Sequence, residues 1–333
     1  MAHFQVHIDE QTREFPANLT KSTEVSIRNL AIEVLSINAD EIVFDLKGVD
    51  SSIANALRRI LLAEVPTVAV ENVWITENSG LVQDEVLAHR VGLVPIKVDP
   101  RRLDFVQEEA GETDADTLVF HLDVHFPQIG EAEGSGHRGQ EDVQQNTGVN
   151  VGPSGYVLSS HLKWLPIGSQ QDMFPEGVEA VHPDIVLTKL RPGQGLEFEA
   201  HCRKGFGRDH AKFQPVATAS YRLMPEVILP QDVVGDEAKE LTALCPEVFD
   251  IEDIGGGAKS AKRAIVKNPR NCTMCRECIR KGHKVKLCRK ADHFIFTVES
   301  VGSMSPQDVV EEALKVLRAK ASKHQERFTP FPT

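Results

Sequence analysis

The stretch "VDSSIANALRRILLAEVP", from Val49 to Pro66, decides how this chain folds. Its apolar residues recur at helical spacing, and one helical face would carry Ile53, Leu57, Ile60 and Leu61. Asp50 or one of the two serines after it can cap the start, and a proline follows the end. The spacing therefore predicts an amphipathic helix over residues 51–63.

A second helix of this kind lies near the end of the sequence, in "SMSPQDVVEEALKVLRAKASKHQERF". Ser305 is suited to cap it, a proline occupies the first turn, and the apolar stripe includes Val310, Leu314 and Leu317. We predict a helix over residues 305–325. The pattern is compatible with two helices that cover one core, and equally with helices whose apolar faces continue into a partner chain.

Strands precede both helices, because "DEIVFDLKG" and "HFIFTVESVG" alternate apolar and polar residues. If these two strands share a sheet, the residues between them are an insertion into one domain. "LEFEAHCRKG" predicts a further strand. Residues 1–23 show no period and predict a flexible arm. Residues 105–159 are rich in Gly, Glu, Gln and Asn, and we predict a mobile surface loop there. The expected fold class is α+β.

Composition is that of a soluble globular protein. The chain has 333 residues, of which 41% are hydrophobic and 26% charged, enough for two or three domains. No apolar run approaches the roughly 18 residues of a membrane span, so we predict no membrane contact. The first residues show the features of neither a signal nor a transit peptide.

Charge is distributed unevenly along the chain. The net charge of −12 argues against a surface that grips nucleic acid as a whole. Residues 258–290, however, hold twelve Lys or Arg and a single acidic residue. A solvated basic face, a contact with an acidic partner and a nucleic-acid site are all compatible with this basic segment.

Four of the six cysteines lie within "CTMCRECIRKGHKVKLC": Cys272, Cys275, Cys278 and Cys288. Three thiols on one short loop can converge on one point, and we predict that the four bind one metal centre. The spacing resembles the start of an iron–sulfur loop, which favours a 4Fe–4S cluster, with zinc as the alternative. His283 is a spare candidate ligand but is expected at the surface. Cys202 and Cys245 are interpreted as structural.

Catalytic motifs are not found in the sequence. Asp209 and His210 are adjacent and could suggest acid–base chemistry, but no nucleophile accompanies them. We interpret them as polar residues of a turn or an interface.

Four stretches together resemble one family: "SIANALRRILLAEVPTVAVE", "QDEVLAHRVGLVPI", "GRDHAKFQPVATASYRL" and "FTVESVGSMSPQDVVEEAL". They occur in the order found in the α-like subunits of multisubunit RNA polymerases. The match runs from about Val25 to Lys320 and is most similar to the branch shared by eukaryotic RNA polymerases I and III. The polymerase II branch has a cysteine zinc loop after the first helix, whereas residues 73–95 here contain no cysteine.

The resemblance implies a division of the chain into four parts. Besides the arm, residues 24–66 and 291–333 would form a discontinuous dimerisation domain, into which an insert domain (67–226) and a ferredoxin-like cysteine-cluster subdomain (227–290) are placed. The late cysteines resemble the iron–sulfur domain of the archaeal member of this family. The predicted dimerisation residues are those of the two helical stripes.

The resemblance also implies a role. The chain would be a non-catalytic assembly subunit that pairs with a small α-like subunit, contacts the second-largest and largest polymerase subunits, and meets DNA only through the complex. It would support rRNA, 5S rRNA and tRNA transcription in the nucleus, including the nucleolus. The resemblance places large-subunit contacts at Arg58, Arg59, Asp209, His210 and Lys212. An iron–sulfur redox protein is the alternative.

Overall fold

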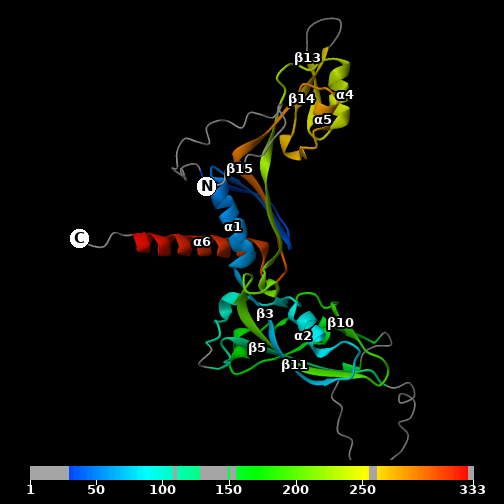
Figure 1. Ribbon diagram of the computed structural model, residues 1–333, viewed down its shortest axis with the longest axis vertical. Helices are drawn as coiled ribbons and strands as arrows, with labels where there is room; N and C mark the ends of the chain where they lie inside the picture. The colour runs from blue at the N-terminus through cyan, green and yellow to red at the C-terminus, as the bar shows by residue number, and fades with distance from the viewer. Residues whose placement is uncertain (1–29, 108–110, 128–148, 151–154, 255–260, 329–333) are drawn as a thin grey trace, which may run out of the picture. The chain divides into compact units, whose positions relative to one another are not determined.

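The computed structural model describes residues 30–107, 111–127, 149–150, 155–254 and 261–328. The predicted arm over residues 1–23 lies outside the described residues. The chain divides into two compact units. The first comprises Met1–Leu35, Val43–Asn55 and Ser220–Phe296, and the second Ser36–Ile42, Ala56–Ala219 and Thr297–Thr333. Helices and strands are combined throughout, and the sheets are mainly antiparallel, as expected of an α+β protein (Figure 1).

A four-stranded sheet has the order β1 (Ala31–Ile37), β2 (Glu41–Lys47), β15 (Lys286–Ser300) and β12 (Val216–Ile228). In the first unit, the rings of Phe44 and Phe296 stack with centroids 5.0 Å apart, and Tyr221 meets Phe294 edge-on at 5.4 Å. Strands β2 and β15 contain the two alternating segments that predicted strands, so that prediction is confirmed. Strand β15 begins earlier than the pattern indicated, at Lys286.

The two predicted helices are confirmed as α1 (Ser51–Ala63) and α6 (Pro306–Phe328). At the start of α1, the carboxylate of Asp50 accepts a hydrogen bond from the Ser52 amide at 2.8 Å. At the start of α6, Ser305 Oγ accepts from the Asp308 amide at 3.1 Å and donates to its carboxylate at 2.6 Å. Both caps satisfy amide donors that a helix start leaves without partners.

The second unit is built on a sheet with the order β3 (Pro66–Asn78), β11 (Gly195–Phe206), β5 (Thr117–His125) and β6 (Val149–Asn150), and β8 (Lys163–Leu165) also pairs with β5. Helix α2 (Asp84–Gly92) covers it through Leu87 and Val91, which belong to the same apolar cluster as Phe120 and Phe198. Smaller elements complete the unit: β4 (Ile96–Lys97), β7 (Tyr156–Leu158), α3 (Gln170–Met173), β9 (Glu179–Ala180) and β10 (Val186–Lys189).

Strand β5 corrects the prediction of a mobile loop over residues 105–159. Alternate residues of this strand are fully buried, namely Leu118, Phe120, Leu122 and Val124. They face the core from the middle of the sheet, because β5 pairs with β11 on one side and with β6 and β8 on the other. Much of the remaining polar region lies outside the described residues.

A separate apolar cluster lies in the first unit between residues 227 and 287. It joins α4 (Asp236–Leu244), the hairpin of β13 (Phe249–Ile254) and β14 (Ala261–Val266), and α5 (Glu277–Arg280), which lie together in Figure 1. Its fully buried or nearly buried members include Ala238, Leu241 and Phe249. Among the described residues the cluster holds ten buried members, against more than twenty in the cluster around β5 and β11, so it offers less apolar stabilisation.

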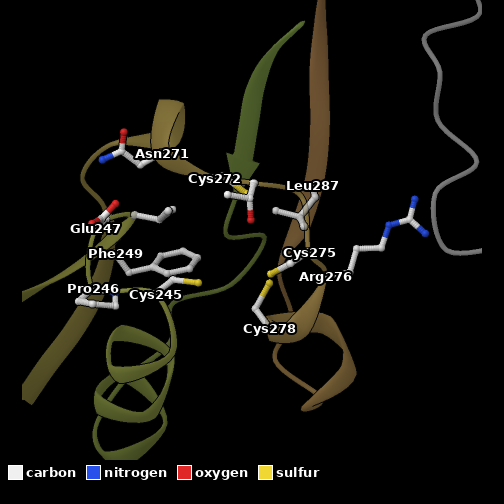
Figure 2. A pocket seen from close by; sticks show the side chains of 12 residues that line it. Cys245, Pro246, Glu247, Phe249, Asn271, Cys272, Cys275, Arg276, Cys278 and Leu287 are labelled. Carbon is white, nitrogen blue, oxygen red and sulfur yellow. The ribbon is translucent and has the colours of Figure 1, made fainter. Parts of the chain in front are cut away.

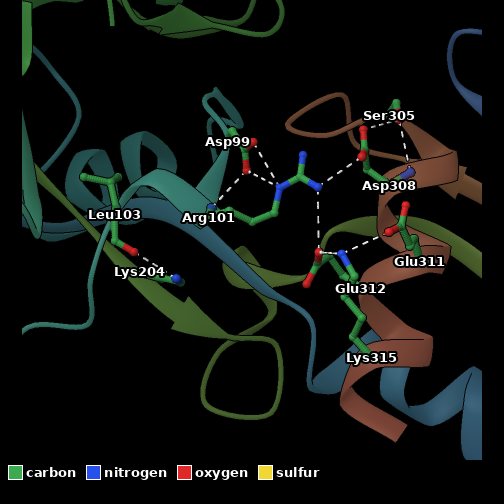
Figure 3. Close-up of polar contacts among 9 residues, drawn as sticks. All are labelled: Asp99, Arg101, Leu103, Lys204, Ser305, Asp308, Glu311, Glu312 and Lys315. Carbon is green, nitrogen blue, oxygen red and sulfur yellow. Dashed lines mark hydrogen bonds and ion pairs between the residues drawn. The ribbon is translucent and has the colours of Figure 1, made fainter. Parts of the chain in front are cut away.

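In the second unit, a charged network holds Arg101 (Figure 3). Its guanidinium donates to Asp99 at 2.9 Å and to Asp308 at 3.2 Å, and Glu312 lies 3.7 Å away. The neighbouring carboxylates raise the pKa of Arg101, so it remains a cation throughout the physiological range. The network fixes the start of α6 to the segment that follows β4. No helix among the described residues is long and apolar enough to span a bilayer.

We predict that Phe120→Ala lowers the free energy of unfolding by about 3–5 kcal/mol, because it leaves a cavity among fully buried side chains. Chemical denaturation of the full-length chain measures this change. His121→Ala is the matched control, since that side chain lies on the opposite face of the same strand, and it should cost far less. Equal, small effects at both positions would restore the interpretation of this segment as a surface loop.

Candidate functional site

A pocket in the first unit gathers most of the cysteines (Figure 2). Its cavity of about 270 Å³ is lined by the thiols of Cys245, Cys272, Cys275 and Cys278, together with apolar side chains that include Phe249 and Leu287. Cys245 lies immediately after α4, and Cys278 lies in α5. The structure therefore brings together three of the four predicted ligands.

Cys288, the predicted fourth ligand, does not line this pocket. The reason is strand geometry: Leu287 lines the pocket, and successive side chains of a strand point to opposite faces. Cys245 takes its place, although the sequence led us to interpret it as structural. One feature of the sequence could have indicated that Cys288 points away from the pocket: it directly follows an apolar residue, Leu287, in an extended segment, and Leu287 is buried. That Cys245 lines the pocket is seen only in the folded structure.

The four thiols lie close enough to influence one another. Burial raises the pKa of Cys278, and the neighbouring Cys245, Cys272 and Cys275 raise it further. Burial likewise raises the pKa of Cys245, with Cys275 and Cys272 adding to the effect. All four cysteines are free thiols. A bound cation would relieve the cost of ionising Cys245 and Cys278 beside their neighbouring thiols.

The loop that presents these thiols has unusual backbone geometry. Met274 and Arg276 both adopt left-handed conformations, with φ of 61° and 64°. Such values are costly for residues other than glycine and persist only where the surroundings enforce them. These two left-handed residues lie between Cys272 and Cys278 and change the direction of the chain there. As they stand, no three His, Cys, Asp or Glu side chains of the described residues are grouped closely enough to hold a metal ion.

Burial revises one further prediction about this segment, and pairing bears on another. His283 is buried, with 6% of its surface exposed, rather than at the surface as expected. Many cations of the basic segment have partners within the chain: Arg263 with Glu252 at 2.8 Å, and Lys267 with Asp250 at 3.0 Å. This pairing favours a solvated face over a nucleic-acid site.

The predicted dimerisation residues divide into two groups. Leu57, Ile60 and Leu61 are buried within the chain, with at most 2% exposure, so they stabilise the chain's own core. On α6, Val310 is 9% exposed, whereas Leu314 is exposed at 36%. Ile53 and Leu317 are half-buried. The surface that α6 offers to a partner is therefore centred on Leu314, whereas the three buried α1 residues lie in the chain's own core, and their contact with a partner stays a prediction.

An apolar surface that the sequence did not single out lies on edge strand β1. All seven residues of the strand are exposed, and exposures of 44–51% are found for Leu30, Ile32, Val34, Leu35 and Ile37. A salt bridge of 2.5 Å from Lys47 to Glu33 ties β1 to β2. An exposed apolar strand at the edge of a sheet is a typical site of association with another chain.

The segment Gly207–Phe213 forms a tight turn in the second unit. His210 Nδ1 accepts a hydrogen bond from the Lys212 amide at 3.1 Å at the start of a short 3-10 helix over Ala211–Phe213. Lys212 forms an ion pair with Glu71, and its ammonium lies over the Phe213 ring. Asp209 and His210 are exposed. The turn thus presents Asp209 and His210 to solvent, while Lys212 serves the chain's own structure.

Arg58 and Arg59 lie in the C-terminal half of α1. Arg59 is exposed, and Arg58 is half-buried and has a partner within the chain. Contact with a large subunit stays a prediction for both arginines, as it does for Asp209 and His210.

Comparison with known proteins places the chain in a family. The model of the RNA polymerase Rpb3/Rpb11 dimerisation domain matches residues 43–321, and the chain belongs to this family of polymerase subunits. Its relatives include the DNA-directed RNA polymerases I and III subunit RPAC1 of Bos taurus, which is 42% identical over 94% of this chain and 90% of the bovine protein. The subunit of the same name in Saccharomyces cerevisiae is 39% identical over 88% of this chain and 86% of the yeast protein.

More distant relatives belong to another polymerase. The DNA-directed RNA polymerase II subunit rpb3 of Dictyostelium discoideum is 31% identical over 88% of this chain, whereas the RNA polymerases I and III subunit rpac1 of the same organism is 41% identical. The resemblance stated from the sequence is thereby confirmed, including the branch shared by polymerases I and III.

We predict that Gly207→Ala destabilises the turn, because an added Cβ would lie 2.2 Å from the Leu62 carbonyl oxygen. The expected loss is about 1–3 kcal/mol of unfolding free energy, as for other overpacked sites. Asp209→Ala, at an exposed position of the same turn, should change stability by less than about 0.5 kcal/mol. Thermal and chemical unfolding of both variants measure the difference, and a neutral Gly207→Ala would contradict this account of the turn.

Proposed function

We propose that this chain is a non-catalytic assembly subunit of DNA-directed RNA polymerases I and III. The observation that carries the proposal is the similarity to RPAC1 subunits over nearly the full length of both chains. The family match to a dimerisation domain supports a structural rather than a catalytic role. The redox alternative has no comparable support. The nucleus, including the nucleolus, is the compartment that this role implies.

The partner that we propose is a small α-like subunit, followed by the second-largest and largest polymerase subunits, with DNA reached only through the complex. Two exposed apolar features support the first step: strand β1 and the Leu314 surface of α6. We also propose the finer division of the chain into a discontinuous dimerisation domain, an insert domain and a cysteine-cluster subdomain. The apolar cluster confined to residues 227–287 supports the last of these.

The assembly role is tested by purifying the tagged full-length chain from cells and identifying what remains bound. The polymerase I and III large subunits and a small α-like subunit are the expected companions. We predict that Leu314→Asp removes most of this co-purification, because it places a charge in a desolvated apolar interface. The chain itself should stay folded, because Leu314 is exposed.

Ala319→Asp is the matched control, since that residue is exposed on the same helix but lies about 140° around its axis from Leu314. It should retain the partners. Leu57→Asp would not serve as a test, because it would unfold the chain's own core. Full retention of all companions by Leu314→Asp would contradict this interface, and an absence of polymerase subunits from the parent chain would overturn the function.

A metal centre is the second proposal, and it concerns the cysteine pocket. Four thiols around one cavity are a donor set that suits tetrahedral zinc or a 4Fe–4S cluster. We propose Cys245, Cys272, Cys275 and Cys278 as ligands, and no longer Cys288. A bound metal would supply structural stability to a segment with a small apolar cluster. The left-handed conformations of Met274 and Arg276 in the loop are costly, and a bound metal would help to maintain them.

We predict that Cys245→Ser lowers the metal content per chain after anaerobic purification, whereas Cys288→Ser leaves it unchanged. Iron, sulfide and zinc analysis combined with visible absorption measures the content and its chemical form. Stoichiometric zinc without absorption near 400 nm would exclude the cluster while keeping the structural site. The reverse order of the two variants would return Cys288 to the ligand set, and a metal-free parent chain would refute both forms.

A further inference from the structure

Asp45 is a buried carboxylate in the first unit that the assembly role does not explain. It lies in β2, and its side chain is 2% exposed. Its Oδ2 accepts hydrogen bonds from Arg270 Nη2 at 2.5 Å and from His293 Nε2 at 2.7 Å. The other oxygen, Oδ1, is buried and has no hydrogen-bond partner among the described residues. A carboxylate removed from water in this way depends on the cations that remain beside it.

The pairing outweighs the cost of burial. Burial alone would raise the pKa of Asp45, but the hydrogen bonds and charges of Arg270 and His293 lower it below its usual value. Lys47 is the next nearest cation, with its Nζ 3.9 Å from the carboxylate. Asp45 therefore carries a negative charge in the sheet, and Arg270 is the closest permanent cation beside it.

Arg270 is held from three directions. Its side chain bonds to Asp45, its carbonyl oxygen accepts from Arg222 Nη1 at 3.0 Å, and its amide donates to Asn268 Oδ1 at 3.2 Å. It lies in the turn Pro269–Asn271, and the amide of Cys272 closes that turn on the Pro269 carbonyl at 3.1 Å. The charged contact in the sheet thus lies two residues before the first thiol of the pocket loop.

We propose that Asp45 is a positioning residue for the cysteine loop: through Arg270 it fixes the turn that presents Cys272 to the pocket. The inference rests on the proposed metal site, because that site gives the cysteine loop its function. The contacts between Asp45, Arg270 and the turn are present without a metal. The coupling is reciprocal. A loop that detaches takes Arg270 with it and leaves Asp45 buried with only His293 and a more distant lysine, so order in the loop and integrity of the sheet support each other.

A merely structural salt bridge would change the stability of the whole unit without singling out one thiol. The distinguishing measurement is therefore the rate at which each cysteine reacts with a maleimide, resolved by mass spectrometry of the full-length chain. Cys202 is fully buried in the second unit and reports global unfolding. Cys288 lies in the same unit as Cys272 but outside the pocket and serves as a nearby reference.

We expect Asp45→Asn and Arg270→Gln each to accelerate labelling of Cys272 about tenfold, the effect of losing one charged hydrogen bond on local opening. Labelling of Cys202 and Cys288 should change little. Arg270→Lys should restore part of the protection, because it keeps the charge but loses the planar fork. Lys267→Gln is the matched control: it removes a cation of the same segment whose partner, Asp250, lies at the surface.

Zinc added to the apo chain separates this inference from the metal proposal. Protection of the pocket thiols by zinc in the parent chain supports the metal site, and its absence refutes the zinc form of that site while leaving the effect of Asp45 measurable. Parent-like labelling of Cys272 in both variants would overturn the inference. If Asp45→Asn or Arg270→Gln unfolds the chain, Arg270→Lys decides, because it keeps a cation beside the buried Asp45 carboxylate while losing the planar fork. Equal acceleration of all cysteines in that variant would also overturn the inference.

Discussion

The burial of one carboxylate in the sheet constrains the first unit. Asp45 cannot remain ionised in an apolar environment without a cation, and its nearest cation is carried by a turn far along the chain. Strand β2, strand β15 and the turn Pro269–Asn271 are therefore held at one point. The first thiol of the cysteine loop is two residues beyond Arg270, so this point also limits where the loop can lie. The charge pair thus adds a specific point of attachment to a segment whose own apolar cluster is small.

The elements that could be predicted from the sequence are those whose period shows within a single stretch. Helices α1 and α6, with their caps, and strands β2 and β15 belong to this group. Strand β5 was missed for a physical reason. Val119 interrupts the alternation of its nine residues, and they lie within a long polar region whose average composition indicated a loop. Burial of Phe120 depends on pairing with β11, which lies far along the chain, and composition carries no information about that pairing.

The cysteine pocket shows the same limit at the level of a site. Closeness in sequence favoured Cys288 as a fourth ligand, whereas the three thiols of the loop line one pocket with Cys245. The fourth position depends on where helix α4 ends and on which face of β15 meets the loop. Alternation along the strand is a local rule, and it accounts for the absence of Cys288 from the pocket lining once Leu287 is known to face the pocket. The placement of Cys245 is tertiary and could not be inferred from spacing.

Helical periodicity identifies an apolar face but does not divide it between a chain's own core and a partner. Leu57 and Leu314 satisfy the same pattern, yet one is 2% and the other 36% exposed. The period assigns both residues to an apolar stripe, but only the packing of the folded chain covers Leu57 and leaves Leu314 exposed. The chain leaves strand β1 and the Leu314 surface of α6 uncovered, and the exposure of this apolar surface to water costs free energy. Association with a second subunit removes that cost, which is the physical reason for an assembly role in a protein of this family.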